Sequence, residues 1–190
     1  MALNYSTPYE LLFAVMLSAQ CTDKKVNQVT AVLFKKYPRL VDYVNADLHE
    51  LEQDVHATGF FRQKAKNIQA TARILFERYH GKLPKVMQEL TALPGVGRKT
   101  ANVVLGNAYG IVEGIAVDTH VRRIAKKYGL TKHTDVKKIE QDLMKLLPQK
   151  DWFECTYLMI EYGRHFCPAH KHNHEACPVT VEFKKAGYKL

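Results

Sequence analysis

The sequence predicts an all-α protein, and three observations support this prediction. Apolar residues recur at three- and four-residue spacing along most of the chain, strand-like alternation is nearly absent, and helix-start and helix-stop residues flank the apolar stripes. With 190 residues and 46% hydrophobic content, the chain can build one large core or two small ones. We therefore expect packed layers of helices.

Six helices are expected in the first half of the chain. The stretch TPYE, residues 7–10, has the form of a capping box with proline at the first helical position, so a helix should begin there and run to about Gln20. Thr22 and Asp23 start the second helix, which Pro38 ends. The remaining four ranges show the same helical periodicity: 47–55, 62–79, 84–92 and 98–109.

The second half begins at YGIVEG, residues 109–114, where two glycines interrupt the helical pattern. We expect a domain boundary there, with one helical domain at 1–111 and another at 112–190. Helices are predicted in this half at 119–128, 135–146 and 151–165. The tail after Cys167 is rich in His, Pro and Lys and shows periodicity again only at 179–184.

The charge of the chain points to a polyanionic partner. The net charge is +9 and the isoelectric point is near 9.3, which favours nucleic acid, with an anionic membrane surface as the weaker alternative. The longest apolar run, LLFAVML at 11–17, is far shorter than the roughly 20 residues that span a bilayer. Four cysteines do not indicate a disulfide scaffold, so we expect a monomer in the reducing cytoplasm, at the nucleoid if the source is bacterial.

A glycine-rich turn, LPGVG at 93–97, joins two of the predicted helices. By itself it reads as a helix–helix turn, because glycine permits the positive φ that ends a helix. A second interpretation uses the bare backbone. The N–H groups of the turn and of the next helix's first turn can approach a phosphate, and the helix dipole adds positive charge there. Arg98 and the basic composition favour phosphate binding.

Lys99 lies on an unusual helix face. Four residues of the 98–109 helix form its core stripe: Ala101, Val104, Leu105 and Ala108. Lys99 projects to the opposite face, beside Val103, Gly106 and Gly110. A lone surface lysine is ordinarily a solvated charge. Its small and apolar neighbours favour a groove instead.

These segments together resemble one family. The stretches that carry the resemblance are LPGVGRKTANVVL (93–105), VDTHVRR (117–123), SAQCTD (18–23), GFFRQKAKNI (59–68) and GRHFC (163–167). They are similar, in order along nearly the whole chain, to the endonuclease III group of helix-hairpin-helix DNA glycosylases. The resemblance implies a two-lobed helical fold that binds duplex DNA in a cleft between the lobes. It also implies removal of a damaged base, usually an oxidised pyrimidine, followed by β-elimination at the abasic sugar.

The resemblance assigns roles to individual residues. Lys99 matches the lysine nucleophile, whose amine must be neutral to attack; we expect burial in a closed groove, helped by the Arg98 cation, to favour that form. Asp118 matches the catalytic aspartate, although an aspartate before THVRR also reads as an ordinary helix N-cap. The expected DNA-binding residues are Gln20, Phe60, Gly95, Val96, Gly97, Arg98, Thr100, His120 and Arg122.

Two of these residues have specific expected tasks. Gln20 matches the residue that fills the space left by a flipped nucleotide, with a polar helix end as the alternative. Phe60 lies where the family places an apolar wedge, and a core aromatic is the alternative. His120 matches a histidine beside the sugar-phosphate, or is a surface histidine of the same helix. Arg122 belongs to a basic helix face that is either solvated or neutralises phosphates.

The chain departs from the family near its C-terminus. Family members hold a [4Fe–4S] cluster with four cysteines spaced C-x6-C-x2-C-x5-C. In the same register this chain has Cys167, His174, Cys177 and Phe183, so we expect no cluster and no cofactor. Zinc is the alternative, because six residues in this region offer ligand atoms: His165, Cys167, His170, His172, His174 and Cys177. The family also places another helix ahead of residue 3, and either a natural start or lost residues account for the difference.

Three rival functions remain open on the sequence alone. A helix-hairpin-helix protein without catalysis would need neither Lys99 nor Asp118, and both are present. A monofunctional adenine-removing relative generally lacks the lysine. A lyase that cleaves abasic sites with little base removal has the same residues, because the choice of base depends on pocket residues far apart in the chain.

Overall fold

The computed structural model describes residues 3–188, and these residues form helices and no strand. The prediction of an all-α protein is therefore confirmed. The described chain divides into two compact units, the first ending at Ile111 and the second beginning at Val112. Over residues 3–188, none of the helices combines the length and the hydropathy that a bilayer crossing requires.

The first unit contains seven α-helices and one short 3₁₀ helix. Their bounds are α1 Pro8–Leu17, α2 Asp23–Lys36, α3 Leu40–Asn45, α4 Leu48–Val55, η1 His56–Thr58, α5 Phe61–Tyr79, α6 Met87–Thr91 and α7 Arg98–Tyr109. The predicted capping box is present at the start of α1. The Thr7 hydroxyl accepts the Glu10 N–H, and the Glu10 carboxylate accepts the Thr7 N–H.

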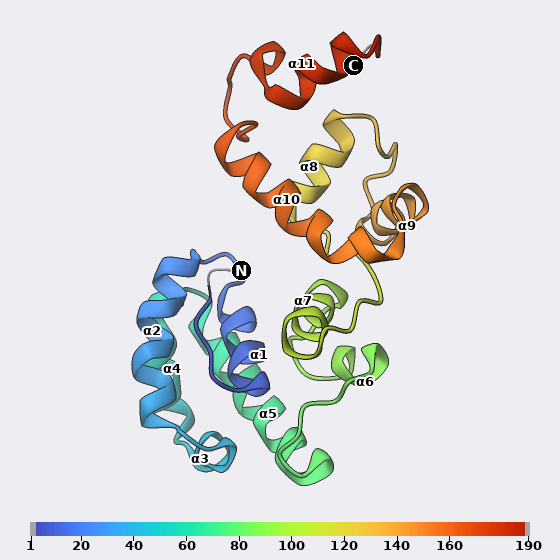
Figure 1. Cartoon of the computed structure of the whole chain (residues 1–190). Coiled ribbons are helices and arrows are strands. Elements are labelled where there is room, and N and C mark those ends of the chain that lie inside the picture. Colours follow the sequence, from blue (N-terminus) through green and yellow to red (C-terminus); the bar gives the residue numbers. More distant parts are fainter. Residues whose placement is uncertain (1–2, 189–190) are drawn as a thin grey trace. The chain divides into compact units, whose positions relative to one another are not determined.

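Helix α1 is the centre of the first unit. Its residues from Leu11 to Leu17 are all buried, which is typical of a helix that is apolar around its whole circumference. It packs against α2, α5 and α7, and Figure 1 shows it between them. The apolar run that is too short for a membrane is thus the core helix of this unit.

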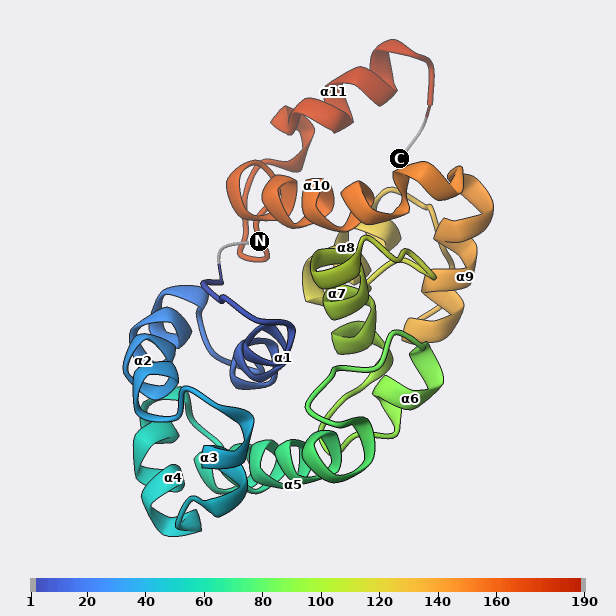
Figure 2. The same ribbon diagram turned by 60° about the horizontal axis from the view of Figure 1, so that its bottom comes forward.

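Two features of the first unit differ from the prediction. Helix α1 ends at Leu17 rather than near Gln20, because the Ser18 hydroxyl donates to the Val15 carbonyl and Gln20 has a left-handed backbone with φ of 56°. The short helix α3 was not predicted. It has six residues, too few for a clear periodic signal, and it forms where Leu40 and Tyr43 pack into the core against α5 (Figure 2).

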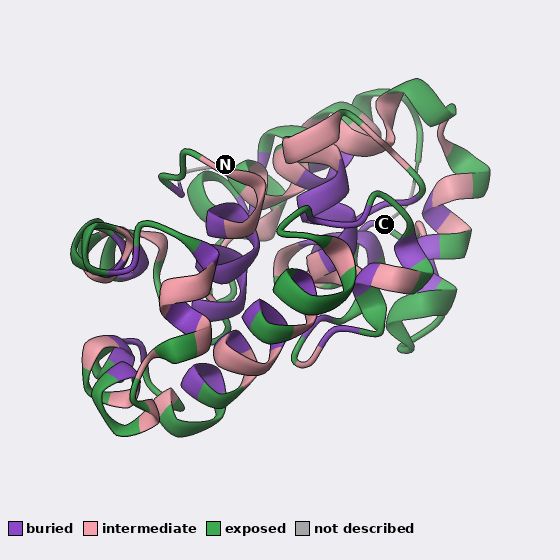
Figure 3. Ribbon diagram, turned by 90° about the horizontal axis from the view of Figure 1, so that it is seen from below, coloured by how far each residue is buried: buried purple, intermediate pink, exposed green. Residues whose placement is uncertain are grey.

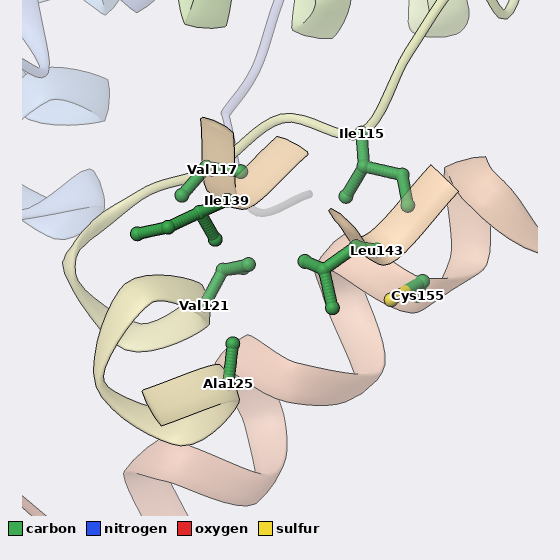
Figure 4. Packing of buried hydrophobic residues seen from close by; sticks show 7 residues of the cluster. All are labelled: Ile115, Val117, Val121, Ala125, Ile139, Leu143 and Cys155. Carbon is green, nitrogen blue, oxygen red and sulfur yellow. The ribbon is translucent and has the colours of Figure 1, made fainter. Parts of the chain in front are cut away.

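The second unit contains four α-helices and two 3₁₀ helices. Their bounds are α8 Thr119–Lys127, α9 Val136–Leu146, η2 Gln149–Asp151, α10 Trp152–His165, η3 His174–Ala176 and α11 Pro178–Lys185. Seven buried residues form its main core, and Figure 4 shows them pointing toward one another: Ile115, Val117, Val121, Ala125, Ile139, Leu143 and Cys155. Cys155 is therefore a small core residue, and burial raises the pKa of its thiol.

A second buried cluster lies farther along α8 and includes Ile124, Tyr128, Cys167 and Cys177, with Phe183 packed against it. The Tyr128 hydroxyl is hydrogen-bonded to the hydroxyls of Tyr162 and Thr180. In Figure 3 the buried residues run as stripes along the helices and leave the other faces exposed. This amphipathic pattern is the one from which the helices were predicted.

Candidate functional site

The glycine turn between α6 and α7 is held by its buried apolar residues. Leu93 and Val96 are both buried, and the Val96 N–H donates to the Leu93 carbonyl. Gly95 has φ of +75°, and a Cβ on it would lie 2.4 Å from the Asn67 side-chain nitrogen. Glycine is therefore needed at 95 both for its conformation and for space. Because the Val96 side chain is buried, only its backbone can meet a ligand.

The first turn of α7 presents backbone donors and cations. Gly97 is the N-cap and supplies no side-chain cap, so the cap itself covers none of the amides that follow it. Arg98, Lys99 and Thr100 occupy the first turn, each half-buried, and that turn contains no acidic residue. Cations here oppose the helix dipole, so the arrangement costs stability and suits an anionic ligand.

Lys99 shares its side of α7 with a buried residue. Val103, one turn further along the helix, is only 8% exposed, and α7 packs against both α1 and α6. Lys99 itself is half-buried. Its amine thus projects from a face that is partly covered by protein, rather than from a fully solvated one.

Phe60 and Gln20 are exposed residues in unfavourable backbone conformations. Phe60 is 66% exposed with φ of 49°, whereas its neighbour Phe61 packs against the His56 ring. The core alternative for Phe60 is therefore wrong. Gln20 is also exposed, with φ of 56°. A left-handed conformation is uncommon for such residues and is retained where the surrounding structure enforces it.

Lys64 holds the backbone just ahead of both Gln20 and Phe60. Its buried ammonium donates to the Leu17 carbonyl at the end of α1 and to the Thr58 carbonyl before Phe60, each at 2.8 Å. Burial lowers the pKa of Lys64, and the nearby Cys21 thiol opposes that shift. Lys64 is not among the functional or structural residues that the sequence predicts. The available signal was that Lys64 falls on the same helical stripe as Ile68, Ala72 and Leu75, where a charge is unexpected.

Replacing Lys64 with methionine should lower the free energy of unfolding by about 2–3 kcal/mol, because two buried carbonyls lose a charged donor. Urea denaturation followed by circular dichroism measures this. Lys66→Met is the matched control, since Lys66 is exposed on the same helix and its loss should change stability by less than about 0.5 kcal/mol. Equal stability of the two variants would remove Lys64 from this role.

Asp118 is the N-cap of α8. Its carboxylate accepts the Val121 N–H at 2.8 Å, so the capping interpretation is confirmed. The segment that leads into it is fixed from α10, where the buried Thr156 hydroxyl bonds to both the N–H and the carbonyl of Ala116. Asp118 is thus held from both sides while its side chain stays half-exposed.

His120 is oriented by an arginine. Arg123 Nη2 lies 3.2 Å from His120 Nδ1, and because a guanidinium only donates, Nδ1 is the acceptor. A neutral His120 therefore carries its proton on Nε2. The same guanidinium donates to the carbonyls of Gly163 and Cys167, so Arg123 is a structural clamp rather than a solvated charge. Arg122 is exposed.

Gly163 completes this contact between α8 and α10. A Cβ on Gly163 would lie 2.8 Å from His120 Nδ1 and 2.9 Å from Arg123 Nη2. Only glycine fits without displacing both side chains. No local pattern in the sequence distinguishes Arg123 from Arg122, since the carbonyls that Arg123 contacts lie 40 and 44 residues away.

Four Cys and His residues converge after α10. The ligand atoms of Cys167, His172, His174 and Cys177 all lie within 4.8 Å of one another. These four are among the six candidate ligands that the sequence offers, and His165 and His170 are not part of the group. Burial raises the pKa of Cys177, as does the neighbouring Cys167 thiol, and burial lowers the pKa of His174. Phe183, at the register position of the family's fourth cysteine, packs instead against the Tyr128 ring, with the two ring planes tilted by 36°.

Comparison with known proteins agrees with this geometry. Residues 13–149 match the family described as HhH-GPD superfamily base excision DNA repair protein. This match includes the glycine turn, Lys99 and Asp118. The chain belongs to this superfamily. The Endonuclease III relatives described next confirm the prediction of the endonuclease III group of helix-hairpin-helix glycosylases, and with it the DNA glycosylase and abasic-site lyase class of enzyme.

Individual members of this superfamily are similar to this chain over most of their own length. Endonuclease III of Synechocystis sp. is 52% identical over 90% of this chain and 78% of its own, and Endonuclease III of Bacillus subtilis is 47% identical over 93% and 81%. A structure of a non-covalent Endonuclease III–DNA complex matches with a TM-score of 0.90 and 45% identity, over all of this chain and 90% of that one. A trapped covalent Endonuclease III–DNA intermediate matches equally well, over 99% and 90%.

Proposed function

We propose that this enzyme excises oxidised pyrimidines from duplex DNA and then cleaves the abasic strand, with Lys99 as the nucleophile and Asp118 as the catalytic carboxylate. The observation that carries the proposal is the position of Lys99. It lies half-buried in the first turn of α7, directly after a bare glycine turn. An amine placed there is next to a phosphate-binding backbone, which suits attack on the adjoining sugar.

The chemistry uses the ability of an amine to form an imine. The neutral Lys99 amine attacks C1′, the C1′–N bond breaks, and the base leaves with the bonding electrons and takes up a proton. Opening of the C1′–O4′ bond gives the iminium, and O4′ is protonated. The iminium makes the C2′ proton acidic. When a base removes this proton, a C2′–C3′ double bond forms, the C3′–O bond breaks and the 3′ phosphate leaves. Water then hydrolyses the imine and releases Lys99.

Asp118 supports the first of these steps. An ionised carboxylate stabilises the positive charge that develops at C1′ as the base departs, and it can accept a proton from the attacking amine. Its hydrogen bond from the Val121 N–H fixes the orientation of the carboxylate. The N-cap role and the proposed catalytic role are therefore compatible.

We propose that the enzyme contacts the sugar-phosphate backbone of DNA rather than its bases. The amides of Gly95 and Gly97 and the first turn of α7, including Arg98 and Thr100, would hold one phosphate region. His120 would donate from Nε2 to a phosphate oxygen, since Arg123 occupies Nδ1. The exposed Arg122 and a net charge of +9 add a salt-sensitive attraction.

Extrusion of the damaged nucleotide requires residues that replace it in the stack. Phe60 offers an exposed aromatic ring for the gap, and the Gln20 amide can both donate to and accept from the orphaned base. Lys64 holds the backbones of both loops. We further propose that the enzyme acts as a monomer on chromosomal DNA in the cytoplasm.

The substrate proposal is tested with a panel of duplexes that differ in one base. We expect release of oxidised and ring-fragmented pyrimidines to exceed release of undamaged pyrimidines by at least about 10³-fold, with strand cleavage following each release. Duplexes with a preformed abasic site measure the lyase step alone. Cleavage of abasic DNA without release of any damaged base would replace the proposal with the rival lyase function.

A further inference from the structure

The side chains of Cys167, His172, His174 and Cys177 form a compact group that the proposed reaction does not use. Their ligand atoms lie within 4.8 Å of one another, and their spacing is C-x4-H-x-H-x2-C. One ion bound at 2.0–2.3 Å by four tetrahedral ligands requires ligand separations of about 3.3–3.8 Å. The separation of Cys167 Sγ from His174 Nδ1 is already 3.7 Å.

We propose that these four residues bind a single zinc ion, as a structural site in place of the family's iron–sulfur cluster. This inference goes beyond the glycosylase reaction and does not depend on it. Two thiolates and two imidazoles are a common donor set for structural zinc. The charge of the two thiolates also balances that of the ion, so a neutral unit would be buried.

His172 provides the most direct support. Its Nδ1 lies 2.9 Å from the His170 carbonyl oxygen, which can only accept, so Nδ1 carries the proton. In the neutral imidazole, Nε2 then carries a lone pair and no proton. That atom is buried and has no hydrogen-bond partner among residues 3–188. A buried acceptor without a donor is costly, and a metal ion would satisfy it.

His174 shows the complementary arrangement. Its Nδ1 faces Cys167 Sγ, while Nε2 lies 3.3 Å from the Thr180 hydroxyl. A metal-binding histidine usually uses one ring nitrogen for the ion and the other for an orienting hydrogen bond. Thr180 is almost fully buried and is itself bonded to the Tyr128 hydroxyl, so this second contact is well fixed.

The two cysteines are shielded from solvent. Cys167 is 0% and Cys177 2% exposed, and both belong to the buried cluster around Tyr128. Cys177 Sγ lies 3.1 Å from the Phe166 carbonyl oxygen. On zinc binding, the Cys177 thiol would lose its proton, and a zinc–sulfur bond would replace this weak S–H hydrogen bond. Burial also protects the thiolates from oxidation.

A four-iron cluster does not fit the same residues. Its fourth position is Phe183, which has no ligand atom and packs on Tyr128 with ring centroids 5.6 Å apart. The group of four also lies around one point rather than around a cluster of several atoms. Two sulfur and two nitrogen ligands favour zinc over harder cations such as magnesium or calcium.

The expected effect of the ion is to hold the segment between α10 and α11. Three of the ligands precede or lie in η3, and Cys177 immediately precedes α11. Zinc would therefore fix this segment against α8 through Tyr128, whose ring lies 5.4 Å from that of His174. Its role is stability of the second unit and not chemistry on DNA.

Metal analysis of the full chain, purified without an affinity tag, tests the proposal. We expect about one zinc per chain, and neither iron nor acid-labile sulfide. After removal of zinc with a chelator, cobalt should bind and give the visible absorption of a tetrahedral site with thiolate ligands. Stoichiometric iron with sulfide, or no metal together with no cobalt spectrum, would overturn it.

A matched pair of histidine variants tests the donor set. His172→Ala should weaken zinc binding by at least about 100-fold in competition with a chromophoric chelator. His170→Ala should leave zinc affinity unchanged, because only the His170 backbone carbonyl takes part. Equal affinities for the two variants would contradict the assignment of His172. If His172→Ala does not fold, the cobalt spectrum of the unmodified chain still decides whether the site exists.

Discussion

Replacing Lys99 with glutamine is expected to abolish both base release and strand cleavage, with a loss in kcat on the order of 10⁴–10⁶-fold. Glutamine keeps a similar length and polarity but has no amine, so neither attack at C1′ nor imine formation is possible. Binding to duplex DNA should weaken little, because the turn amides and Arg98 are unchanged. The fold should also be retained, since a cation in the first turn of α7 opposes the helix dipole.

Borohydride trapping on abasic-site DNA measures this directly. Reduction of the imine should join the unmodified chain covalently to DNA and should give no adduct with Lys99→Gln. Lys137→Gln is the matched control, because Lys137 is an exposed lysine at the same position in the first turn of α9. An adduct with Lys99→Gln would assign the nucleophile to another amine.

The second large effect is expected from Asp118→Asn. Asparagine caps a helix as well as aspartate does, so the free energy of unfolding should change by less than about 0.5 kcal/mol. Base release should fall by about 10²–10⁴-fold, because the negative charge that stabilises the developing cation at C1′ is lost. Cleavage of a preformed abasic site should fall less, since its aldehyde forms an imine without departure of a base.

Single-turnover rates on damaged-base and abasic duplexes separate these two steps. Asp135→Asn is the control, because Asp135 caps α9 in the same way, accepting the Lys138 N–H at 3.0 Å. It should leave both rates unchanged. If Asp118→Asn released the base at the unmodified rate, the carboxylate would have only its capping role.

Local sequence signals predicted most of the helices. The capping box at Thr7, the N-cap at Asp118 and the glycine turn before α7 each depend on residues within one or two helical turns. For that reason, they could be recognised without knowing any tertiary contact. The short helix α3 was missed because its six residues form against α5, and no pattern of that length identifies a helix.

The candidate site was predictable in part. The roles of Lys99, Asp118 and Gln20 come from the resemblance to a family and remain predictions, of which the variants above test those of Lys99 and Asp118. The sequence could not predict which of Phe60 and Phe61 is exposed, since the two residues are adjacent and identical in type. The structure shows that Phe60 is exposed and that Phe61 contacts His56.

The helical class, the bare glycine turn and the positions of the lysine and the capping aspartate after it follow from the order of the residues alone. The tertiary structure shows which polar residues are structural. Lys64 bonds to a carbonyl 47 residues away, and Arg123 to one 44 residues away. It also decided that His172, rather than His165 or His170, lies with Cys167, His174 and Cys177. The reason is physical: helix signals act over a few neighbouring residues, whereas the burial of a charge or a ligand atom depends on segments that meet only on folding.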